Sequence, residues 1–209
     1  MARHGSEYKL FDSEAKFANG FRYRPDFITE DEEELLLSFI AAQDLKRVTA
    51  GENDEYVGRR HYKHFGWSFR RDTLVPGPEL PRFLQRFARR IEKWLSLPRG
   101  RVVEALINEY PAGTGVGWHK DNEPFEHVVG ISLAGWAKMR LRPLARRGKR
   151  RASDIEALEV GPRSVYVMQG DVRDNWQHSI APTKTLRYSI TFRTLPKNMR
   201  TPKKKWVRR

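Results

Sequence analysis

The stretch NEYPAGTGVGWHKD, residues 108–121, places a histidine and an aspartate two positions apart, as His119 and Asp121. A strand-like segment and a glycine-rich turn precede the pair, so the residues that hold it are expected to be extended. On an extended backbone, residues i and i+2 project from the same face. The sequence therefore predicts that the imidazole of His119 and the carboxylate of Asp121 converge on one metal ion.

A third metal ligand must come from another part of the chain, and only two histidines follow Asp121. His127 is close in sequence, on the same predicted hairpin, and we interpret it as an exposed or hydrogen-bonded side chain. His178 lies between the strand-like SVYVMQGD, residues 164–171, and the final strand, so a barrel that closes on itself brings it beside the strand of His119. Two histidines and one carboxylate leave three positions of an octahedron open, which suits an Fe(II) oxygenase.

The final predicted strand, Arg187–Thr194 with the sequence RYSITFRT, predicts a second binding group. Arg187 and Arg193 share one face, about 20 Å apart at ~3.3 Å per residue, and the residues of the other face are apolar or aromatic. An arginine pair inside a barrel is costly unless an anion neutralises it, so we expect the two side chains to bracket a small dicarboxylate. Alternatively, Arg193 is a rim residue paired with surface carboxylates. Asn108 and Tyr110 also share a face and offer neutral donors to the same anion.

Helical patterns precede the strand-like half of the chain. The segment Thr29–Gln43 begins with a capping box, and Glu79–Leu97 repeats apolar residues at helical spacing. Short strands and turns follow, which predicts an α+β fold with a jelly-roll barrel behind two supporting helices. We expect a single domain over residues 1–209, with helices and a lid over about 20–100, the jelly-roll core over 101–195 and a basic tail over 197–209.

The composition is strongly basic. Forty lysines and arginines against 26 acidic residues give a net charge of +14 and a pI near 10.2, which favours a polyanionic partner such as nucleic acid. The basic segments 142–154 and 197–209 are expected to be solvent-exposed and are suited to binding phosphates. The absence of cysteine excludes a disulfide framework and a zinc–thiolate site. Without a membrane-spanning run or a signal-peptide core, we expect a cytoplasmic monomer with no membrane partner.

Five elements in this order resemble the AlkB-like 2-oxoglutarate- and Fe(II)-dependent dioxygenases. They are an Asn-x-Tyr strand, a glycine-containing turn, a His-x-Asp pair, a distal histidine and a closing Arg-x5-Arg strand, here NEYPAGTGVGWHKD, WQHSI and RYSITFR. The upstream segments FRYRPDFITEDEEELL and RRHYKHFGWSF extend the resemblance over roughly residues 20–195. HFGWSF looks most similar to the dioxygenase domain of the tRNA wobble-uridine hydroxylase branch. The resemblance implies a double-stranded β-helix, or jelly-roll, core with a nucleotide-recognition lid.

The resemblance also implies the metal and the reaction. Carried over residue by residue, His119, Asp121 and His178 would hold Fe(II), with 2-oxoglutarate and O2 as co-substrates. Oxidation of a substrate C–H bond would then accompany the conversion of 2-oxoglutarate to succinate and CO2. If the oxidised carbon is a methyl group on a base nitrogen, the product would lose formaldehyde and leave the repaired base.

The same resemblance implies the co-substrate contacts. Arg187, with Asn108 and Tyr110, would hold the C5 carboxylate of 2-oxoglutarate, and Arg193 would help to orient the C1 end. Ser189 lies on the same face of the final strand as the two arginines. It stands where some members of the family have asparagine, which weakens one polar contact to the co-substrate.

Four residues are candidates for substrate contacts. Glu123 follows the aspartate ligand at a position where relatives often have an acidic group that contacts the exocyclic amine of a flipped base; the alternative is a solvated loop glutamate. Trp67 would stack on a flipped base or wall it off, and a core position is the alternative. Arg59 and Arg60 would suit backbone phosphates.

Three functions follow from this interpretation. The first is oxidative dealkylation of N-alkylated or etheno bases in DNA or RNA, that is, nucleic-acid repair. The second is hydroxylation of a modified tRNA nucleoside without dealkylation. The third is a nucleic-acid-binding module with a vestigial pocket, against which the complete ligand set and both arginines argue. A protein hydroxylase is a further alternative that the charge makes less attractive.

Overall fold

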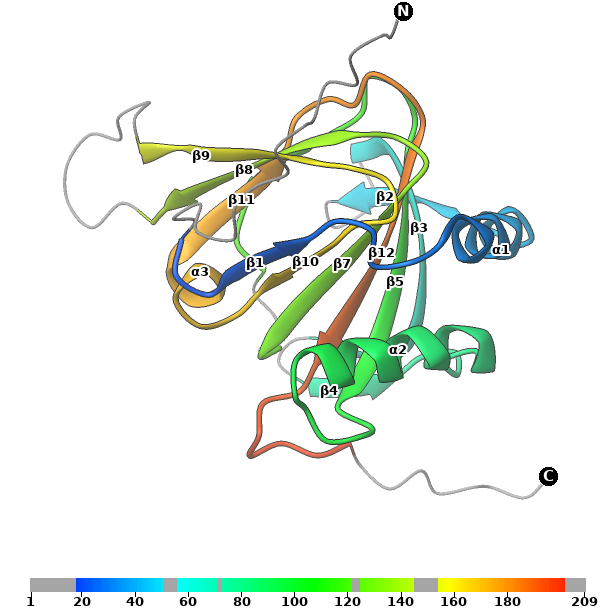
Figure 1. The fold of residues 1–209 in the computed structure, drawn as a ribbon, viewed down its shortest axis with the longest axis vertical. Helices are drawn as coiled ribbons and strands as arrows, with labels where there is room; N and C mark the ends of the chain where they lie inside the picture. Colours follow the sequence, from blue (N-terminus) through cyan, green and yellow to red (C-terminus); the bar gives the residue numbers. More distant parts are fainter. Residues whose placement is uncertain (1–17, 51–55, 71–72, 122–124, 145–153, 202–209) are drawn as a thin grey trace, which may run out of the picture.

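Two antiparallel β-sheets form the centre of the computed structural model, which describes residues 18–50, 56–70, 73–121, 125–144 and 154–201 (Figure 1). The larger sheet has eight strands and runs in the order β1 (Phe21–Arg24), β10 (Val165–Met168), β7 (His127–Leu133), β12 (Arg187–Thr194), β5 (Val102–Tyr110), β3 (Tyr56–Arg70) and β2 (Lys46–Ala50), with β4 (Thr73–Pro76) paired to β3. The smaller sheet runs in the order β6 (Val116–His119), β11 (Trp176–Ile180), β8 (Ala137–Pro143) and β9 (Glu156–Val160).

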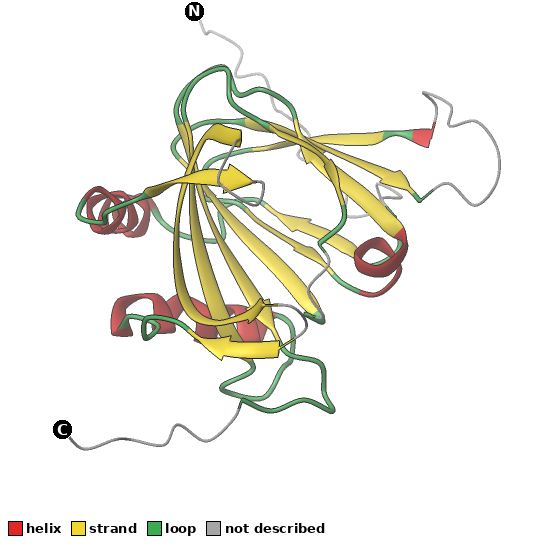
Figure 2. Cartoon of the chain, turned by 180° about the vertical axis from the view of Figure 1, so that it is seen from behind, coloured by secondary structure: helices red, strands yellow, loops and turns green. Residues whose placement is uncertain are grey.

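This strand order confirms the predicted jelly roll. Neighbours within each sheet are mostly distant in sequence, as β12 between β5 and β7 illustrates, and successive strands alternate between the sheets from β5 to β8. The closing strand β12 has the bounds that its alternation predicts, and it pairs with β5 from Arg187 to Thr194 and with β7 from Tyr188 to Thr194. Strand β12 lies in the middle of the larger sheet, between β7 and β5, and the smaller sheet faces one side of the larger one (Figure 2).

Two helices cover the outer face of the larger sheet, as expected. Helix α1 (Glu30–Ala41) begins with the predicted capping box, in which Thr29 Oγ1 accepts from the N–H of Glu32 at 3.2 Å. Helix α2 (Arg82–Trp94) lies within the predicted span. Their buried apolar side chains pack on the outward faces of β5 and β12 and form the first core cluster, which includes Leu36, Ile40, Leu84, Phe87, Ile91, Ile107, Ile190 and Phe192.

A second apolar core fills the space between the two sheets. It combines side chains from the small sheet, including Met139, Leu141, Val160 and Ile180, with residues of β1, β7 and β10. The short helix α3 (Gly170–Asn175) adds Val172 and leads directly into β11. The polar site described below shares this interior, so its side chains are held by packed strands on both sides.

The N-terminal half differs from the expected set of helices and a lid, because it also supplies four strands. The longest, β3, runs from Tyr56 to Arg70 and joins the larger sheet between β2 and β5. Its sequence includes RRHYKHF, where charged residues and histidines hide the alternation that usually predicts a strand.

Within the described parts of the chain, no helix has the length and apolar character needed to cross a bilayer.

Candidate metal centre and carboxylate pocket

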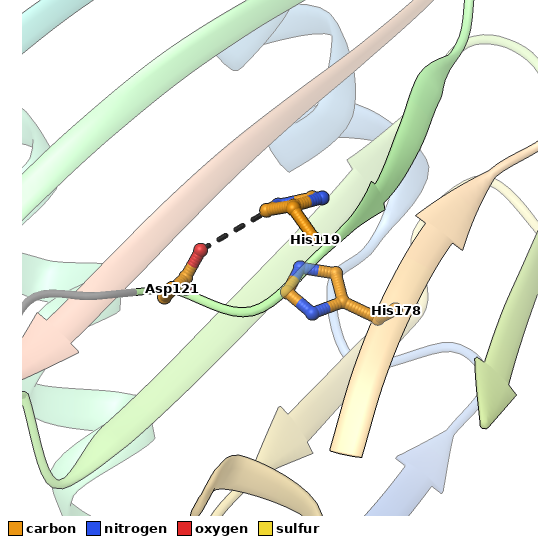
Figure 3. A group of neighbouring side chains, drawn as sticks. All are labelled: His119, Asp121 and His178. Carbon is orange, nitrogen blue, oxygen red and sulfur yellow. Dashed lines mark ion pairs between the residues drawn. The ribbon is translucent and has the colours of Figure 1, made fainter. Parts of the chain in front are cut away.

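His119, Asp121 and His178 lie together at the edge where β6 meets β11. His119 ends β6 and is the direct cross-strand partner of His178, with 4.1 Å between the two ring centres. Asp121 follows β6 after one residue, and its Oδ1 lies 3.6 Å from Nε2 of His119. One ligand atom from each residue lies within 4.8 Å of the others, and the three side chains point toward one another (Figure 3). The predicted group is thus brought together by the fold.

The orientation of His119 suits a metal ligand. Its Nδ1 lies 2.9 Å from the carbonyl oxygen of Gly117, and an Nδ1–H that donates to this carbonyl leaves the lone pair of Nε2 facing the other two ligands. Burial alone would lower the pKa of His119, but its contacts with Asp121 and with the Gly117 carbonyl raise the pKa above its ordinary value.

The other two ligands carry the protonation states that a metal requires. Burial would raise the pKa of Asp121, yet the contact with His119 and the charge of Arg193 outweigh it and hold the pKa well below its usual range. Burial lowers the pKa of His178 to about 4, so its imidazole is neutral at physiological pH. A carboxylate and two imidazoles without thiolates fit a non-haem Fe(II) ion and leave coordination positions for other ligands.

A basic residue that the sequence did not reveal fixes the aspartate. Arg173, on α3, is only 6% exposed and donates from Nη1 to the backbone carbonyl of Asp121 at 3.0 Å. This bond connects the segment that follows β6 to the helix that precedes β11. It therefore helps to hold His119 and Asp121 near His178. Arg173 lies in VRDNW, where nothing distinguishes it from the chain's other arginines.

A buried cation lies on β12, the strand whose other arginine, Arg193, faces Asp121. Arg187 is 1% exposed, and its Nε donates to Oγ of Ser132 at 3.1 Å. Its Nη1 and Nη2 are buried and have no hydrogen-bond partner among the described residues. Leaving two guanidinium nitrogens unpaired inside a protein costs free energy that a bound carboxylate would remove. The geometry therefore fits the predicted carboxylate ligand.

The predicted neutral partners surround this guanidinium. Tyr110 is the cross-strand partner of Arg187, with 5.0 Å between its ring centre and the guanidinium carbon. Asn108 is paired with Ser189 in the next inward-facing positions, and both are buried. Oδ1 of Asn108 has no hydrogen-bond partner among the described residues. Ser189 is also the cross-strand partner of Ser132, so these residues form one polar group on three neighbouring strands, which we call the carboxylate pocket.

Arg193 lies farther along the same strand and is already paired. Its Nη1 donates to Oε1 of Glu104 at 3.1 Å, and its Nη2 lies 3.7 Å from Oδ2 of Asp121. The alternative of a rim residue does not apply, since the Arg193 side chain is 12% exposed and Glu104 is buried. Arg193 therefore connects the aspartate ligand to a second buried carboxylate.

Glu104 extends this connection to β3. Its Oε1 also lies 3.2 Å from Nε2 of His64, which is mostly buried on β3. Two inward-facing positions of β5 and β3 thus hold the arginine that faces Asp121. Sequence reasoning missed both residues because only the strand register brings them together.

Tyr166 is a further residue of this interior that sequence reasoning missed. Its ring lies over Gly130 on the neighbouring strand, where a Cβ would come within 2.3 Å of the ring. Burial raises the pKa of the Tyr166 phenol to about 12, so it remains a neutral hydrogen-bond donor. The charges of Arg187 and Asp121 also act on the pKa of this phenol, in opposite directions.

The structure does not bring Trp67, the predicted aromatic substrate contact, to the metal group. Trp67 lines a cavity of about 300 Å³ between the β3–β4 hairpin and α2, which contains none of the three metal-ligand residues. Two positions on, Phe69 packs edge-on against Phe125 at 5.1 Å, and Phe125 lies 5.5 Å from the guanidinium of Arg193. Phe69 is therefore linked through Phe125 to Arg193, the arginine that faces Asp121. Glu123 lies outside the described residues.

The predicted phosphate contacts, Arg59 and Arg60, lie on β3 near the β5–β6 connection. Arg59 is exposed and donates from Nη2 to the carbonyl of Ala112 at 3.3 Å. The guanidinium of Arg60 lies 6.0 Å from the ring centre of Tyr110. Tyr110 therefore contacts both Arg60 and Arg187.

Sequence comparisons agree with this geometry. A sequence profile described as the 2OG-Fe(II) oxygenase superfamily matches residues 21–193. The "Uncharacterized protein L905" of Acanthamoeba polyphaga mimivirus is 26% identical over 204 residues, which cover 88% of each chain. The "Alkylated DNA repair protein ALKBH8 homolog" of Arabidopsis thaliana is 29% identical over 195 residues, 82% of this chain and 53% of its own.

A third relative is the "tRNA (carboxymethyluridine(34)-5-O)-methyltransferase alkbh8" of Xenopus tropicalis, 26% identical over 172 residues. The match covers 76% of this chain and 24% of that protein, so the chain spans only part of the length of the plant and Xenopus relatives. Among solved structures, OsALKBH1 superposes with a TM-score of 0.62 at 16% identity, over 85% of this chain and 99% of that one. A prolyl-4-hydroxylase from Pseudomonas putida gives 0.59 at 13%, over 86% and 94%. These likenesses show the shared jelly-roll fold.

Proposed function

Because this chain belongs to the 2OG-Fe(II) oxygenase superfamily, whose members use Fe(II), 2-oxoglutarate and O2, we propose that it oxidatively removes alkyl groups from bases in nucleic acid. The observation that carries this proposal is a buried Arg187 guanidinium with two unpaired nitrogens, in a fold that also brings together a complete two-histidine, one-carboxylate group. A metal site alone would suit many reactions. A metal site next to a carboxylate pocket suits a dicarboxylate that chelates the metal.

The chain's own residues divide into a metal set and a co-substrate set. His119, Asp121 and His178 would hold Fe(II), with the Gly117 carbonyl fixing the tautomer of His119. Iron and 2-oxoglutarate, when bound, supply the oxidation: one oxygen atom of O2 enters the substrate and the other enters succinate, with release of CO2. The protein contributes ligand geometry and a pocket shielded from water.

In the co-substrate set, Arg187 would pair with the C5 carboxylate through its two Nη groups. Asn108, Tyr110 and Ser189 would complete the polar lining, each from a position opposite or next to Arg187 in register. Nη1 of Arg193 already donates to Glu104, and Nη2 faces Asp121. Arg193 would therefore act on the C1 end of 2-oxoglutarate indirectly, through Asp121. Its role is therefore to hold the aspartate ligand as much as to orient the co-substrate.

The substrate class is supported by charge and by relatives. The net charge of +14 favours a polyanion. The Arabidopsis relative carries the name of an alkylated DNA repair protein. In our proposal Phe69 and Phe125 wall the base that is turned out of the strand, and the product of methyl oxidation on a base nitrogen breaks down to formaldehyde and the repaired base.

Hydroxylation of a modified tRNA nucleoside is the second candidate, and the name of the Xenopus relative favours it. A mass-spectrometric screen of methylated and etheno DNA and RNA oligonucleotides, with and without iron and 2-oxoglutarate, separates the two. Dealkylation predicts a loss of the methyl mass with release of formaldehyde, whereas stable hydroxylation predicts a gain of one oxygen that stays on the nucleoside. If no oligonucleotide changes mass and no succinate forms, both candidates are wrong.

A further inference from the structure

A separate cavity of about 380 Å³ lies between β3 and the connection from β5 to β6. Its lining consists of Val48, Gly58, Arg59, Arg60 and residues 113–117. It adjoins the metal centre, since β6 begins in its wall at Val116 and ends at His119. On its inner side, Arg60 lies over the face of Tyr110, the tyrosine that also contacts Arg187.

Among the residues that the structure describes, the lining of this cavity carries positive charge without a carboxylate. Two arginines and no acidic residue belong to its lining. Four other arginines of the described chain have carboxylate partners, in the pairs Arg90–Glu32, Arg101–Glu126, Arg163–Glu33 and Arg193–Glu104. Arg59 instead donates to a backbone carbonyl and Arg60 faces an aromatic ring, and no carboxylate of the described residues pairs with either. Such a site favours an anion.

The opposite wall is built from residues with small side chains or none. A Cβ at Gly117 would meet no heavy atom within 4 Å, and a Cβ at Gly113 would meet only the Arg59 guanidinium, at 3.6 Å. A ligand can therefore approach both the loop backbone and the guanidinium of Arg59. Arginine guanidinium groups bind phosphate oxygens in pairs, with short charge-assisted hydrogen bonds.

We propose that this cavity binds a backbone phosphate adjacent to the nucleotide whose base enters the metal centre. This inference rests on the proposed function and adds to it that the enzyme requires a phosphate on its substrate. A methylated nucleoside would then be a poor ligand, its monophosphate a better one and a single-stranded oligonucleotide the best. Contacts to phosphate position the strand without reading its sequence.

Binding without turnover tests the site. The Kd of a fluorescein-labelled single-stranded oligonucleotide is measured by anisotropy with Mn(II) in place of iron, for wild type, Arg59→Gln, Arg60→Gln and the double variant. Arg82→Gln, an exposed arginine on α2, is the matched control for the loss of one charge. We expect each cavity variant to weaken binding roughly five- to tenfold at 0.1 M salt, and to reduce the slope of log K against log salt by about 0.7 per lost contact. An effect no larger than that of Arg82→Gln overturns the proposal.

Competition identifies the source of the phosphate. An N-methylated nucleoside, its 5′-monophosphate and inorganic phosphate compete against the labelled strand. For wild type, we expect the monophosphate to compete at least about tenfold better than the nucleoside. We expect the double variant to lose this difference. Inorganic phosphate should compete poorly with both proteins. Equal competition by nucleoside and monophosphate contradicts a phosphate site. Competition by inorganic phosphate as strong as that of the monophosphate contradicts a site for the nucleic-acid backbone.

Two controls keep the outcomes separate. Arg59 is exposed and makes one backbone contact, so Arg59→Gln should retain the wild-type melting curve, and Arg59→Lys should recover part of the lost affinity. Because Arg60 contacts Tyr110, the 2-oxoglutarate Kd of Arg60→Gln is measured as well. If oligonucleotides bind through the cavity and no base is oxidised, the phosphate site stands and the proposed function fails. If wild type and the double variant oxidise bases equally, the proposed function stands and the phosphate site fails.

Discussion

His119 and His178 are direct cross-strand partners on β6 and β11, and their ring centres lie 4.1 Å apart. Strands that are separated by more than fifty residues of sequence thus place two imidazoles in adjacent positions. Asp121 joins them from the end of β6, where Arg173 holds its backbone carbonyl. The metal centre is therefore a product of one strand pairing and one buried arginine.

Replacing His178 with alanine should lower the affinity for Mn(II), used as a redox-inactive substitute for Fe(II), by more than about 100-fold. The reason is that one of three protein ligands is lost, and even outer partners of such ligands are worth 10- to 100-fold. Isothermal titration calorimetry measures the affinity. His127→Gln is the control, because His127 lies outside the group and contacts Thr194. An equal loss of Mn(II) affinity in both variants would show that the two histidines affect metal binding only by stabilising the fold.

Replacing Arg187 with methionine should weaken 2-oxoglutarate binding by roughly 10- to 100-fold, the value of charge-assisted hydrogen bonds of about 1.5–3 kcal/mol. The apo-protein should melt at a temperature at least as high as wild type, because a buried guanidinium with unpaired nitrogens has been removed. Thermal melts with and without Mn(II) and 2-oxoglutarate measure both effects.

Arg101→Met is the matched control for that variant. Arg101 is paired with Glu126 at 3.1 Å, so its loss should lower the melting temperature and leave 2-oxoglutarate binding unchanged. A marked drop in apo-protein stability for Arg187→Met, with normal co-substrate affinity, would mean that Arg187 is structural.

Glu104→Gln should lower the free energy of unfolding by about 1–3 kcal/mol, because a buried charged hydrogen bond to Arg193 is weakened. Arg193 would then interact more strongly with Asp121, so Mn(II) affinity should fall severalfold. Urea denaturation and calorimetry measure the two quantities. Glu109→Gln is the control: it lies on the same strand and pairs with His61 at 2.8 Å outside the barrel interior, where a half-exposed pair is worth less than about 1 kcal/mol. A metal affinity unchanged by Glu104→Gln would refute the connection.

The stability of the protein should fall as the pH falls below about 6.5, in part through His127. Burial lowers the pKa of His127 in the folded state, whereas the unfolded state keeps the ordinary value. The unfolded state therefore binds the proton first, so the contribution of His127 is complete above the unfolded pKa and is lost as the pH falls toward the folded one. His127→Gln should show a smaller loss of unfolding free energy between pH 7.5 and 5.5, and an NMR titration should give His127 a pKa below 6.5. A pKa above that value contradicts the account.

Much of the fold could be predicted because its decisive strands carry alternation. The final strand, Arg187–Thr194, has one apolar face and one polar face, and both faces lie where the pattern indicates. The metal ligands could be predicted for a related reason, since two of them are fixed by the geometry of an extended backbone. Thr29 and Glu32 likewise mark the start of α1 by local chemistry alone.

The remaining parts of the site depend on register, which a single sequence does not specify. Glu104 meets Arg193 only because β5 and β12 pair in one alignment, and His64 joins them through β3. In HFGWSF the alternation is interrupted at Gly66, whose φ of +87° departs from extended backbone. For that reason alternation along the whole segment could not place Trp67 relative to the metal group.

The most direct test of the proposed function is the stoichiometry of one reaction. Wild type and Asp121→Asn are each incubated with Fe(II), 2-oxoglutarate, O2 and an oligonucleotide that carries an N-methylated base, and succinate, formaldehyde and the demethylated base are measured together. The account predicts equal amounts of all three products for wild type and none above background for Asp121→Asn. Succinate without demethylation across the methylated DNA and RNA series, or equal product from the two proteins, would contradict it.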